Sequence, residues 1–413
     1  MKRLLLTAIT VLLIALGSAR AGPFEDGAAA YQRGDYATAQ KIFQTLAAQG
    51  NAEAQYNLGF MYDSGKGVKQ DYAEALKWYR LAVAQGVALA QFNLGVMYGN
   101  GRGVKQDDAE ALKWYRLAAA QGDAIAQGNL GFMYDSGKGV TPDFAEARKW
   151  YRLAAAQGDA ISQFNLGFMY DSGKGVAPDF AEARKWYLVA AAQGDALSQF
   201  NLGVMYDTAR GIRQDYAEAL KWYRLAAAQG NALAQGNLAV MFDSGKGITQ
   251  DYAEALKWYR LAAAQGNALA QANLGVMYAN GRGVKQDYAE ALKWYRLAAA
   301  QGDARAQGNL GFMYESGSGV AQDRAEALKW YRLAAAQGNA LAQGNLGVIY
   351  AEGLGVAQNP VRAYMWLNMG AVSGSENAVK NRDIVAKRIT PQQIAEARQM
   401  ASDCQKRSFK GCD

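Results

Sequence analysis

The side chains able to do acid–base chemistry in this 413-residue chain are carboxylates, because the sequence contains no histidine. Histidine is the usual general base near neutral pH and the commonest metal ligand, so a histidine-based triad or zinc site is excluded. Asp and Glu recur three residues apart before apolar runs, as at Asp251 and Glu254. This spacing predicts a capping box, in which the aspartate accepts a backbone N–H at a helix start and the glutamate reaches back to the cap. We therefore assign the paired carboxylates to helix starts and expect no enzyme activity, catalytic residue, cofactor or metal site.

The sequence has no motif for acyl-enzyme chemistry or for phosphate binding. The S-x-x-K, S-D-N and K-T-G motifs of penicillin-recognising enzymes do not occur in the sequence. The string Ser64-Gly65-Lys66-Gly67 lacks the spacing of a phosphate-binding loop and follows a helical pattern instead of a strand. We interpret it as a turn.

The elements that position these residues repeat with a fixed period. Nine tryptophans follow one another at intervals of 36 residues, at Trp78, Trp114, Trp150, Trp186, Trp222, Trp258, Trp294, Trp330 and Trp366. A constant period of this length is typical of an array in which each unit packs on its neighbours.

Residues 251–286 illustrate one unit as two predicted helices. The first begins after Asp251, ends at Gly266 and buries one face at the i, i+3, i+4, i+7 spacing; the second begins at Asn267. The expected buried residues are Ala255, Trp258, Tyr259 and Ala262 in the first helix, and Ala270, Leu274, Met277 and Tyr278 in the second.

Glycines inside and after the second helix have different expected roles. Gly275 lies within the helix, where glycine costs about 1 kcal/mol relative to alanine, so we expect a large ring, that of the tryptophan, to pass close to it. Gly281 and Gly283 form the turn that follows. In one unit Ala209 takes the first of these two places, and we expect strain there if the position needs a positive φ.

The pattern A-x-x-x-L-G-x-x-Y-x-x-G-x-G-V-x-x-D-x-x-x-A-x-x-W-Y-x-x-A-A-x-x-G resembles the Sel-one-like repeat (SLR), a relative of the tetratricopeptide repeat. Nine units match, over residues 51–374. The resemblance implies an all-α, right-handed superhelical solenoid of stacked antiparallel helix pairs that acts as a scaffold for protein complexes. It also implies that exported bacterial members serve envelope signalling, exopolysaccharide regulation or host contact.

The ends of the chain depart from the repeat. Residues 22–50 are expected to form an N-terminal cap and a first helix, and residues 375–413 a C-terminal helical cap with a start signal at Thr390 and Gln393. The two cysteines, Cys404 and Cys412, lie close together in the last ten residues, and we expect a structural disulfide between them.

Residues 1–21 have the pattern of a cleavable signal peptide. Two basic residues precede an apolar run from Leu4 to Leu16, and Ala19-Arg20-Ala21 supplies small residues for cleavage. The alternative, a membrane anchor, is disfavoured because the run is too short for roughly 30 Å of hydrocarbon. We expect a periplasmic or secreted protein with no membrane span.

The net charge argues against nucleic acid as a partner. Formal net charge is +7 with 44 basic and 37 acidic residues; without the three basic residues of the leader, the remaining excess lies in residues 379–413. The repeats are neutral overall, whereas phosphate-backbone binding depends on a basic stripe.

Basic side chains recur on the polar side of the tryptophan-bearing helices. Glu74, three residues before Lys77, favours a solvated face with ion pairs worth a few tenths of a kcal/mol. The alternative is a row of cations along the inner curve of the solenoid, alternating with residues of the Tyr72 and Leu76 type. This candidate partner-binding face comprises Tyr72, Leu76, Lys77, Arg80, Arg116, Arg152, Arg224, Arg260, Arg296 and Arg332.

Three functions remain open from the sequence. The first is an exported adaptor that binds a protein partner in the cell envelope or on a host and performs no chemistry. The second is a receptor for a repeating polymer such as a glycan or peptidoglycan, because AEALKWYRLAAAQG is identical at 217–230, 253–266, 289–302 and 325–338. The third, a hydrolase of the β-lactamase kind, is disfavoured by the missing motifs.

Overall fold

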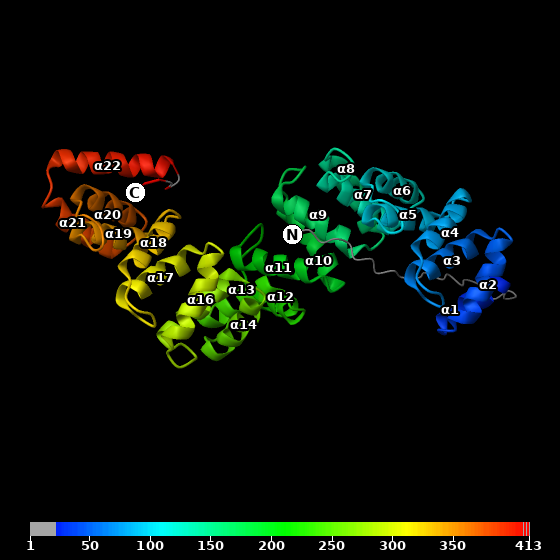
Figure 1. Ribbon diagram of the computed structural model, residues 1–413, viewed down its shortest axis with the longest axis horizontal. Helices are drawn as coiled ribbons and strands as arrows, with labels where there is room; N and C mark the ends of the chain where they lie inside the picture. Colours follow the sequence, from blue (N-terminus) through cyan, green and yellow to red (C-terminus); the bar gives the residue numbers. More distant parts are fainter. Residues whose placement is uncertain (1–21, 408, 410, 413) are drawn as a thin grey trace. The chain divides into compact units, whose positions relative to one another are not determined.

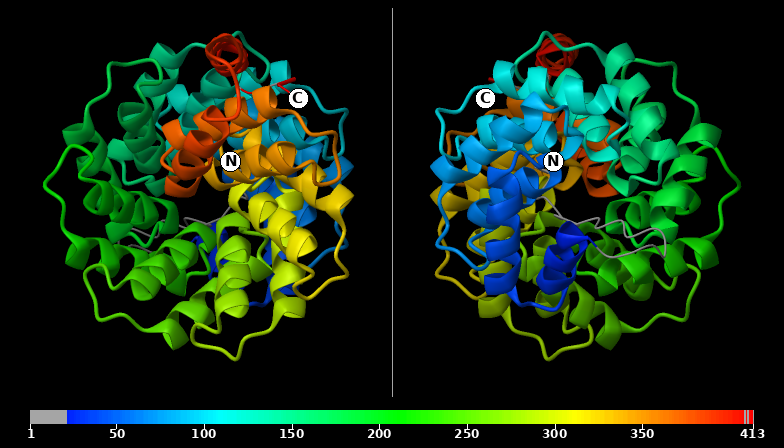
Figure 2. Two further views of the ribbon diagram at one scale, coloured as in Figure 1. Left: turned by 90° about the vertical axis from the view of Figure 1, so that its left-hand side faces the viewer. Right: turned by 90° about the vertical axis from the view of Figure 1, so that its right-hand side faces the viewer.

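The computed structural model describes residues 22–407, 409, 411 and 412, and all regular structure in this part of the chain is α-helical. The signal peptide expected at residues 1–21 lies outside the described residues. Contacts divide the chain into two compact units, Met1–Ser198 and Gln199–Asp413, and each is treated by itself below. Within each unit, helices that follow one another along the chain pack side by side, as Figures 1 and 2 show.

Two kinds of helix alternate. The helices that carry the tryptophans, here called tryptophan helices, are α4 (Tyr72–Ala84), α6 (Asp108–Ala120), α8 (Phe144–Ala156), α10 (Phe180–Ala192), α12 (Tyr216–Ala228), α14 (Tyr252–Ala264), α16 (Tyr288–Ala300), α18 (Arg324–Ala335) and α20 (Pro360–Val372).

The helices between them carry the internal glycine or its replacement and are called glycine helices. They are α3 (Ala52–Ser64), α5 (Ala88–Asn100), α7 (Ala124–Ser136), α9 (Ala160–Ser172), α11 (Ala196–Thr208), α13 (Ala232–Ser244), α15 (Ala268–Asn280), α17 (Ala304–Ser316) and α19 (Ala340–Glu352). Helices α1 (Pro23–Gln32) and α2 (Tyr36–Ala48) precede the repeats, and α21 (Glu376–Ala386) and α22 (Pro391–Lys406) follow them.

Helix starts confirm half of the predicted capping box. Asp251 Oδ1 accepts the backbone N–H groups of Ala253 and Glu254, at 2.9 and 3.0 Å. The prediction that the glutamate reaches back to the cap is wrong. Glu254 instead accepts from Lys257 Nζ at 3.2 Å and from Trp258 Nε1 at 3.1 Å, because those donors lie one turn ahead on the same side of the helix. The capping box expected at Thr390 and Gln393 is present.

The helix glycines pack against tyrosine, except Gly347, which packs against Leu367, so the expected tryptophan contact is wrong. A Cβ on Gly59 would lie 2.8 Å from a ring carbon of Tyr79, and one on Gly311 would lie 2.5 Å from Tyr331. The reason is helical geometry: Tyr259 shares the buried face of Ala255 and Ala262, whereas the neighbouring residue Trp258 is turned about 100° away. Tyr259 is fully buried and Trp258 is only partly buried.

Buried glutamines join successive 36-residue repeats. Gln85 Nε2 donates to Gln55 Oε1 at 2.8 Å and to the Gly50 carbonyl at 3.0 Å, while Gln55 Nε2 donates to the Ala47 carbonyl at 3.2 Å. Gln55 is buried, so losing any partner would leave a costly unsatisfied amide. The bonds recur at 36-residue intervals and hold the helices in register.

The structure confirms the left-handed backbone expected at Ala209 and the disulfide expected between Cys404 and Cys412. Ala209 has a φ of 59°, the left-handed conformation that its glycine equivalents adopt, as Gly245 does at 73°. Cys404 and Cys412 form a disulfide that closes the C-terminal turn after α22. Phe409, inside this loop, lies against Gly338 in the turn between α18 and α19.

Candidate functional site

An asparagine recurs at the same position of every glycine helix, and we call these residues the amide row. Most members are partly exposed, so their side chains can meet a ligand. The amide row consists of Asn57, Asn93, Asn129, Asn165, Asn201, Asn237, Asn273, Asn309 and Asn345.

A buried tyrosine orients several of these amides. Asn93 Nδ2 donates to Tyr79 Oη at 3.1 Å, and Tyr79 Oη lies 3.5 Å from Asp63 Oδ2 as its donor. Burial raises the pKa of Tyr79 far above its ordinary value, so this phenol stays protonated and can donate. The chain of contacts therefore runs from a carboxylate through a phenol to an amide.

The same arrangement returns in the second unit. Asn237 Nδ2 donates to Tyr223 Oη at 3.1 Å, and Tyr223 Oη donates to Asp207 Oδ2 at 3.3 Å. Asn273 donates to Tyr259 at 3.0 Å. A phenol that takes one amide N–H leaves the amide oxygen and its second N–H for another molecule. An acceptor and a donor side by side match the N–H and C=O of an extended peptide.

The residue immediately before each asparagine, here called the variable position, differs between repeats. It is aromatic in Tyr56, Phe92, Phe164 and Phe200, whose rings lie 5.8 to 6.1 Å from the buried tyrosines of the following tryptophan helices. It is small in the remaining five repeats, at Gly128, Gly236, Ala272, Gly308 and Gly344.

The face predicted from the sequence lies on the tryptophan helices, where many of its residues are engaged within the chain. Leu76 is buried, so its assignment to a contact surface is wrong: its side chain packs in the core with Tyr79. Tyr72 is partly buried. Lys77 pairs with Glu74 at 3.4 Å and lies 5.5 Å from the centre of the Trp78 ring.

The arginines of that predicted face reach the next glycine helix. Arg80 donates to Tyr98 Oη at 3.2 Å, and Arg116 to Tyr134 Oη at 2.6 Å. Arg260, Arg296 and Arg332 make the equivalent bonds at 2.7, 2.7 and 3.2 Å. Arg152 and Arg224 are exposed, the latter 6.0 Å from the Phe242 ring centre. Most of these cations thus have a structural partner.

Sequence reasoning missed the amide row, although a signal for it was present. Asparagine precedes the Leu-Gly pair, or Leu-Ala in one unit, in all nine repeats, while its neighbour alternates between aromatic and small residues. A fixed polar residue beside a varying one is typical of a recognition surface with a common and a selective part. The identical segment that drew attention lies on α12, α14, α16 and α18, away from the amide row.

No group of three or more His, Cys, Asp or Glu side chains suited to a metal occurs among residues 22–407 and the few described beyond them. Within that same part of the chain, no helix is both long and apolar enough to cross a bilayer.

Comparisons with known proteins agree with the geometry. The Sel1 repeat model matches nine consecutive segments, at residues 52–87, 88–123, 124–159, 160–195, 196–231, 232–267, 268–303, 304–339 and 340–375. No curated protein matches the sequence.

Two solved structures illustrate the likeness. A protective antigen present in uropathogenic Escherichia coli strains, displaying an SLR fold, is 36% identical, with a TM-score of 0.69 over 94% of this chain and 92% of that one. A Sel1 repeat protein from Oxalobacter formigenes is 39% identical, with a TM-score of 0.54 over 59% of this chain and 99% of that one. With the repeat model covering most of its length, this all-α solenoid belongs to the Sel1 repeat family.

Proposed function

We propose that this protein is a non-enzymatic exported scaffold that binds an extended segment of a partner protein along its glycine helices. The observation that carries the proposal is the amide row, in which buried tyrosines each take one N–H of Asn93, Asn237 and Asn273. Sel1 repeat proteins are in general protein-interaction scaffolds, which agrees with this reading.

Backbone recognition would tolerate many sequences, because every residue except proline offers the same N–H and C=O. The variable position would then add selectivity from one repeat to the next. This division of labour favours a protein partner over a uniform polymer, since a polymer of identical units gives no reason for the lining to vary.

Export is supported by two features. The leader pattern of residues 1–21 directs a chain across a membrane, and the disulfide between Cys404 and Cys412 persists in oxidising compartments. The periplasm, the bacterial cell surface or the medium is the proposed location, and an envelope or host protein the proposed partner.

Site-specific photo-crosslinking tests the proposal. A photo-reactive amino acid replaces Leu269, which is 36% exposed on α15, or Leu261, which is 44% exposed on the tryptophan helix α14 and serves as the matched control. We expect envelope extracts to give a discrete protein adduct from position 269 that disappears when Asn273→Ala and Asn309→Ala are added.

Adducts from position 261 alone would contradict the proposal. They would show that the partner contacts the tryptophan helices, as the sequence analysis predicts. Retention on peptidoglycan or exopolysaccharide without any protein adduct would replace the proposal by the polymer-receptor function. Turnover above background in hydrolase screens of the purified protein would contradict its non-enzymatic part.

A further inference from the structure

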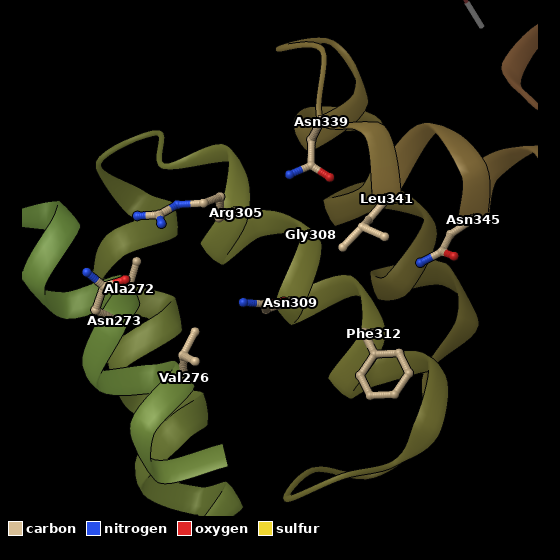
Figure 3. A pocket seen from close by; sticks show the side chains of 10 residues that line it. All are labelled: Ala272, Asn273, Val276, Arg305, Gly308, Asn309, Phe312, Asn339, Leu341 and Asn345. Atoms are coloured by element: carbon tan, nitrogen blue, oxygen red, sulfur yellow. The ribbon is translucent and has the colours of Figure 1, made fainter. Parts of the chain in front are cut away.

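A cavity of about 370 Å³ opens on the glycine helices α15, α17 and α19 of the second unit (Figure 3). Its volume lies within the range of small-molecule and side-chain pockets. Asn273, Asn309 and Asn345 of the amide row all line it, which places the cavity directly on the proposed path of a bound peptide.

The cavity exists where the variable position holds small residues, Ala272 and Gly308. Packing does not force the glycine: a Cβ on Gly308 would lie 3.4 Å from Asn339 Oδ1, close to ordinary contact. Gly311 in the same helix differs, because a Cβ there would overlap Tyr331. Glycine inside a helix lowers stability, and packing does not require it at position 308. A glycine there does leave the cavity open, because a larger side chain would enter it.

One cation lines the cavity. Arg305 stands at a position occupied by leucine or isoleucine in seven of the other repeats and by Glu53 in the first. No carboxylate lines the cavity. The nearest acid is Asp303, whose Oδ2 lies 3.9 Å from Arg305 and whose Oδ1 caps α17 through the Ala306 N–H at 2.8 Å. The arginine side chain is 55% exposed and available for a second anion.

The positive charge of Arg305 reaches the phenols beneath the amide row. Burial raises the pKa of Tyr259 and of Tyr295, while the arginine acts on both in the opposite direction. At Tyr259 the negative charge of Asp243 outweighs that of the arginine, whereas at Tyr295 Arg305 is the charge that acts.

Large apolar side chains line another part of the cavity (Figure 3). Phe312 is 56% exposed and Leu341 is 64% exposed, and both line the cavity. An exposed aromatic ring and an exposed leucine around a concave site are typical of a place where a partner buries an apolar side chain.

Building on the function proposed above, we propose that this cavity binds an extended partner segment with an Asp or Glu carboxylate on Arg305 and a large apolar side chain against Phe312 and Leu341. The two partner residues are an even number of positions apart, since alternate side chains of an extended chain point to the same side.

A random peptide library displayed on phage and selected on the full-length protein tests this assignment. We expect enrichment of sequences with an acidic residue two or four positions from Leu, Ile, Met or Phe. Binding of a selected peptide should weaken as salt rises, because the arginine contact is partly exposed.

Two variants with native precedents in other repeats locate the contact. Arg305→Leu, which installs the residue of Leu269 and Leu341, should weaken an enriched peptide about tenfold or more at low salt and abolish the acidic preference. Gly308→Phe, which installs the residue of Phe92 and Phe164, should fill the cavity and abolish binding. Leu261→Phe, on the exposed side of the tryptophan helix α14, is the matched control outside the glycine-helix surface and should leave binding unchanged. Melting curves establish that all three variants are folded.

The outcomes separate the two proposals. Peptides enriched without an acidic preference, or bound equally well by Arg305→Leu, would overturn the assignment of the cavity while leaving peptide binding along the amide row intact. No enrichment of any peptide, or binding indifferent to Asn273→Ala and Asn309→Ala together, would overturn the proposed function as well.

Discussion

The two units of the chain fill the surface of their glycine helices in different ways. In the first unit Tyr56, Phe92 and Phe164 cover the buried tyrosines of the tryptophan helices, and only Gly128 departs from this pattern. In the second unit Phe200 does the same, but the four repeats after it carry Gly or Ala. One backbone arrangement thus supports a surface largely covered by aromatic rings and a surface with a cavity of about 370 Å³.

The difference teaches which residues hold the fold and which shape its surface. The buried tyrosines, glutamine pairs and capping aspartates recur in both units, so they belong to the architecture. The variable position changes without any change in helix bounds. Variation that leaves the scaffold intact is free to serve recognition.

The largest expected effect comes from removing a ring in the first unit. Phe92 is 7% exposed and packs 5.8 Å from the Tyr115 ring, so Phe92→Ala should lower the free energy of unfolding by about 3 kcal/mol. The reverse change in the second unit, Gly308→Phe, should alter it by less than about 1 kcal/mol, because the ring enters open space. Urea unfolding measures both. Equal losses would show that the small residues are also structural.

A smaller effect is expected from the two glycines of α17. Gly311→Val would drive methyl groups into Tyr331 and should cost about 2 kcal/mol, whereas Gly308→Val should be nearly neutral. Ala239, the natural replacement in α13, shows that one methyl is tolerated, which is why valine is the sharper probe. Comparable melting temperatures for the two variants would refute the distinction between them.

At Ala209 a gain in stability is expected. Its φ of 59° is unfavourable for a residue with a Cβ, so Ala209→Gly should stabilise the protein by roughly 0.5 to 1 kcal/mol. Gly245→Ala, at the equivalent position of the next repeat with a φ of 73°, is the matched control and should lose a similar amount. A neutral result at both positions would mean that the left-handed conformation carries no strain here.

The smallest expected effect depends on pH. Burial raises the pKa of Asp63, so the native state keeps this proton at pH values where the unfolded chain has lost it. The contribution of the group to stability therefore falls as pH rises from about 4 through the raised pKa. Asp63→Asn, which can still accept from Tyr79, should be more stable than wild type at pH 7 and lose that advantage below pH 4. Denaturation at the two pH values measures the change, and an advantage independent of pH would contradict it.

Much of the fold follows from the sequence because each repeat carries local signals for the start and end of its helices. Aspartate or asparagine caps, left-handed glycines and a 36-residue period are local signals, and the helices begin and end where those signals lie. The disulfide was equally predictable, since the chain has two cysteines close together.

The proposed binding surface was harder to predict because it depends on contacts between repeats. Trp258 and Tyr259 are neighbours in sequence, and their different burial appears only when the helix is packed against the next one. The burial of Leu76 likewise depends on packing between helices, so the sequence alone places it wrongly on a surface. The amide row involves Asn93, Tyr79 and Asp63, residues separated by 14 and 16 positions, so no short motif contains it.

The most direct test of the central claim is the affinity of one library-selected peptide for two variants of the full-length protein, measured by titration calorimetry. Asn273→Ala removes an amide from the glycine-helix surface, and Arg260→Ala removes a cation from the tryptophan-helix surface of the preceding helix. The account predicts a loss of at least about fivefold for Asn273→Ala and no change for Arg260→Ala. Loss with Arg260→Ala and full affinity with Asn273→Ala would contradict it.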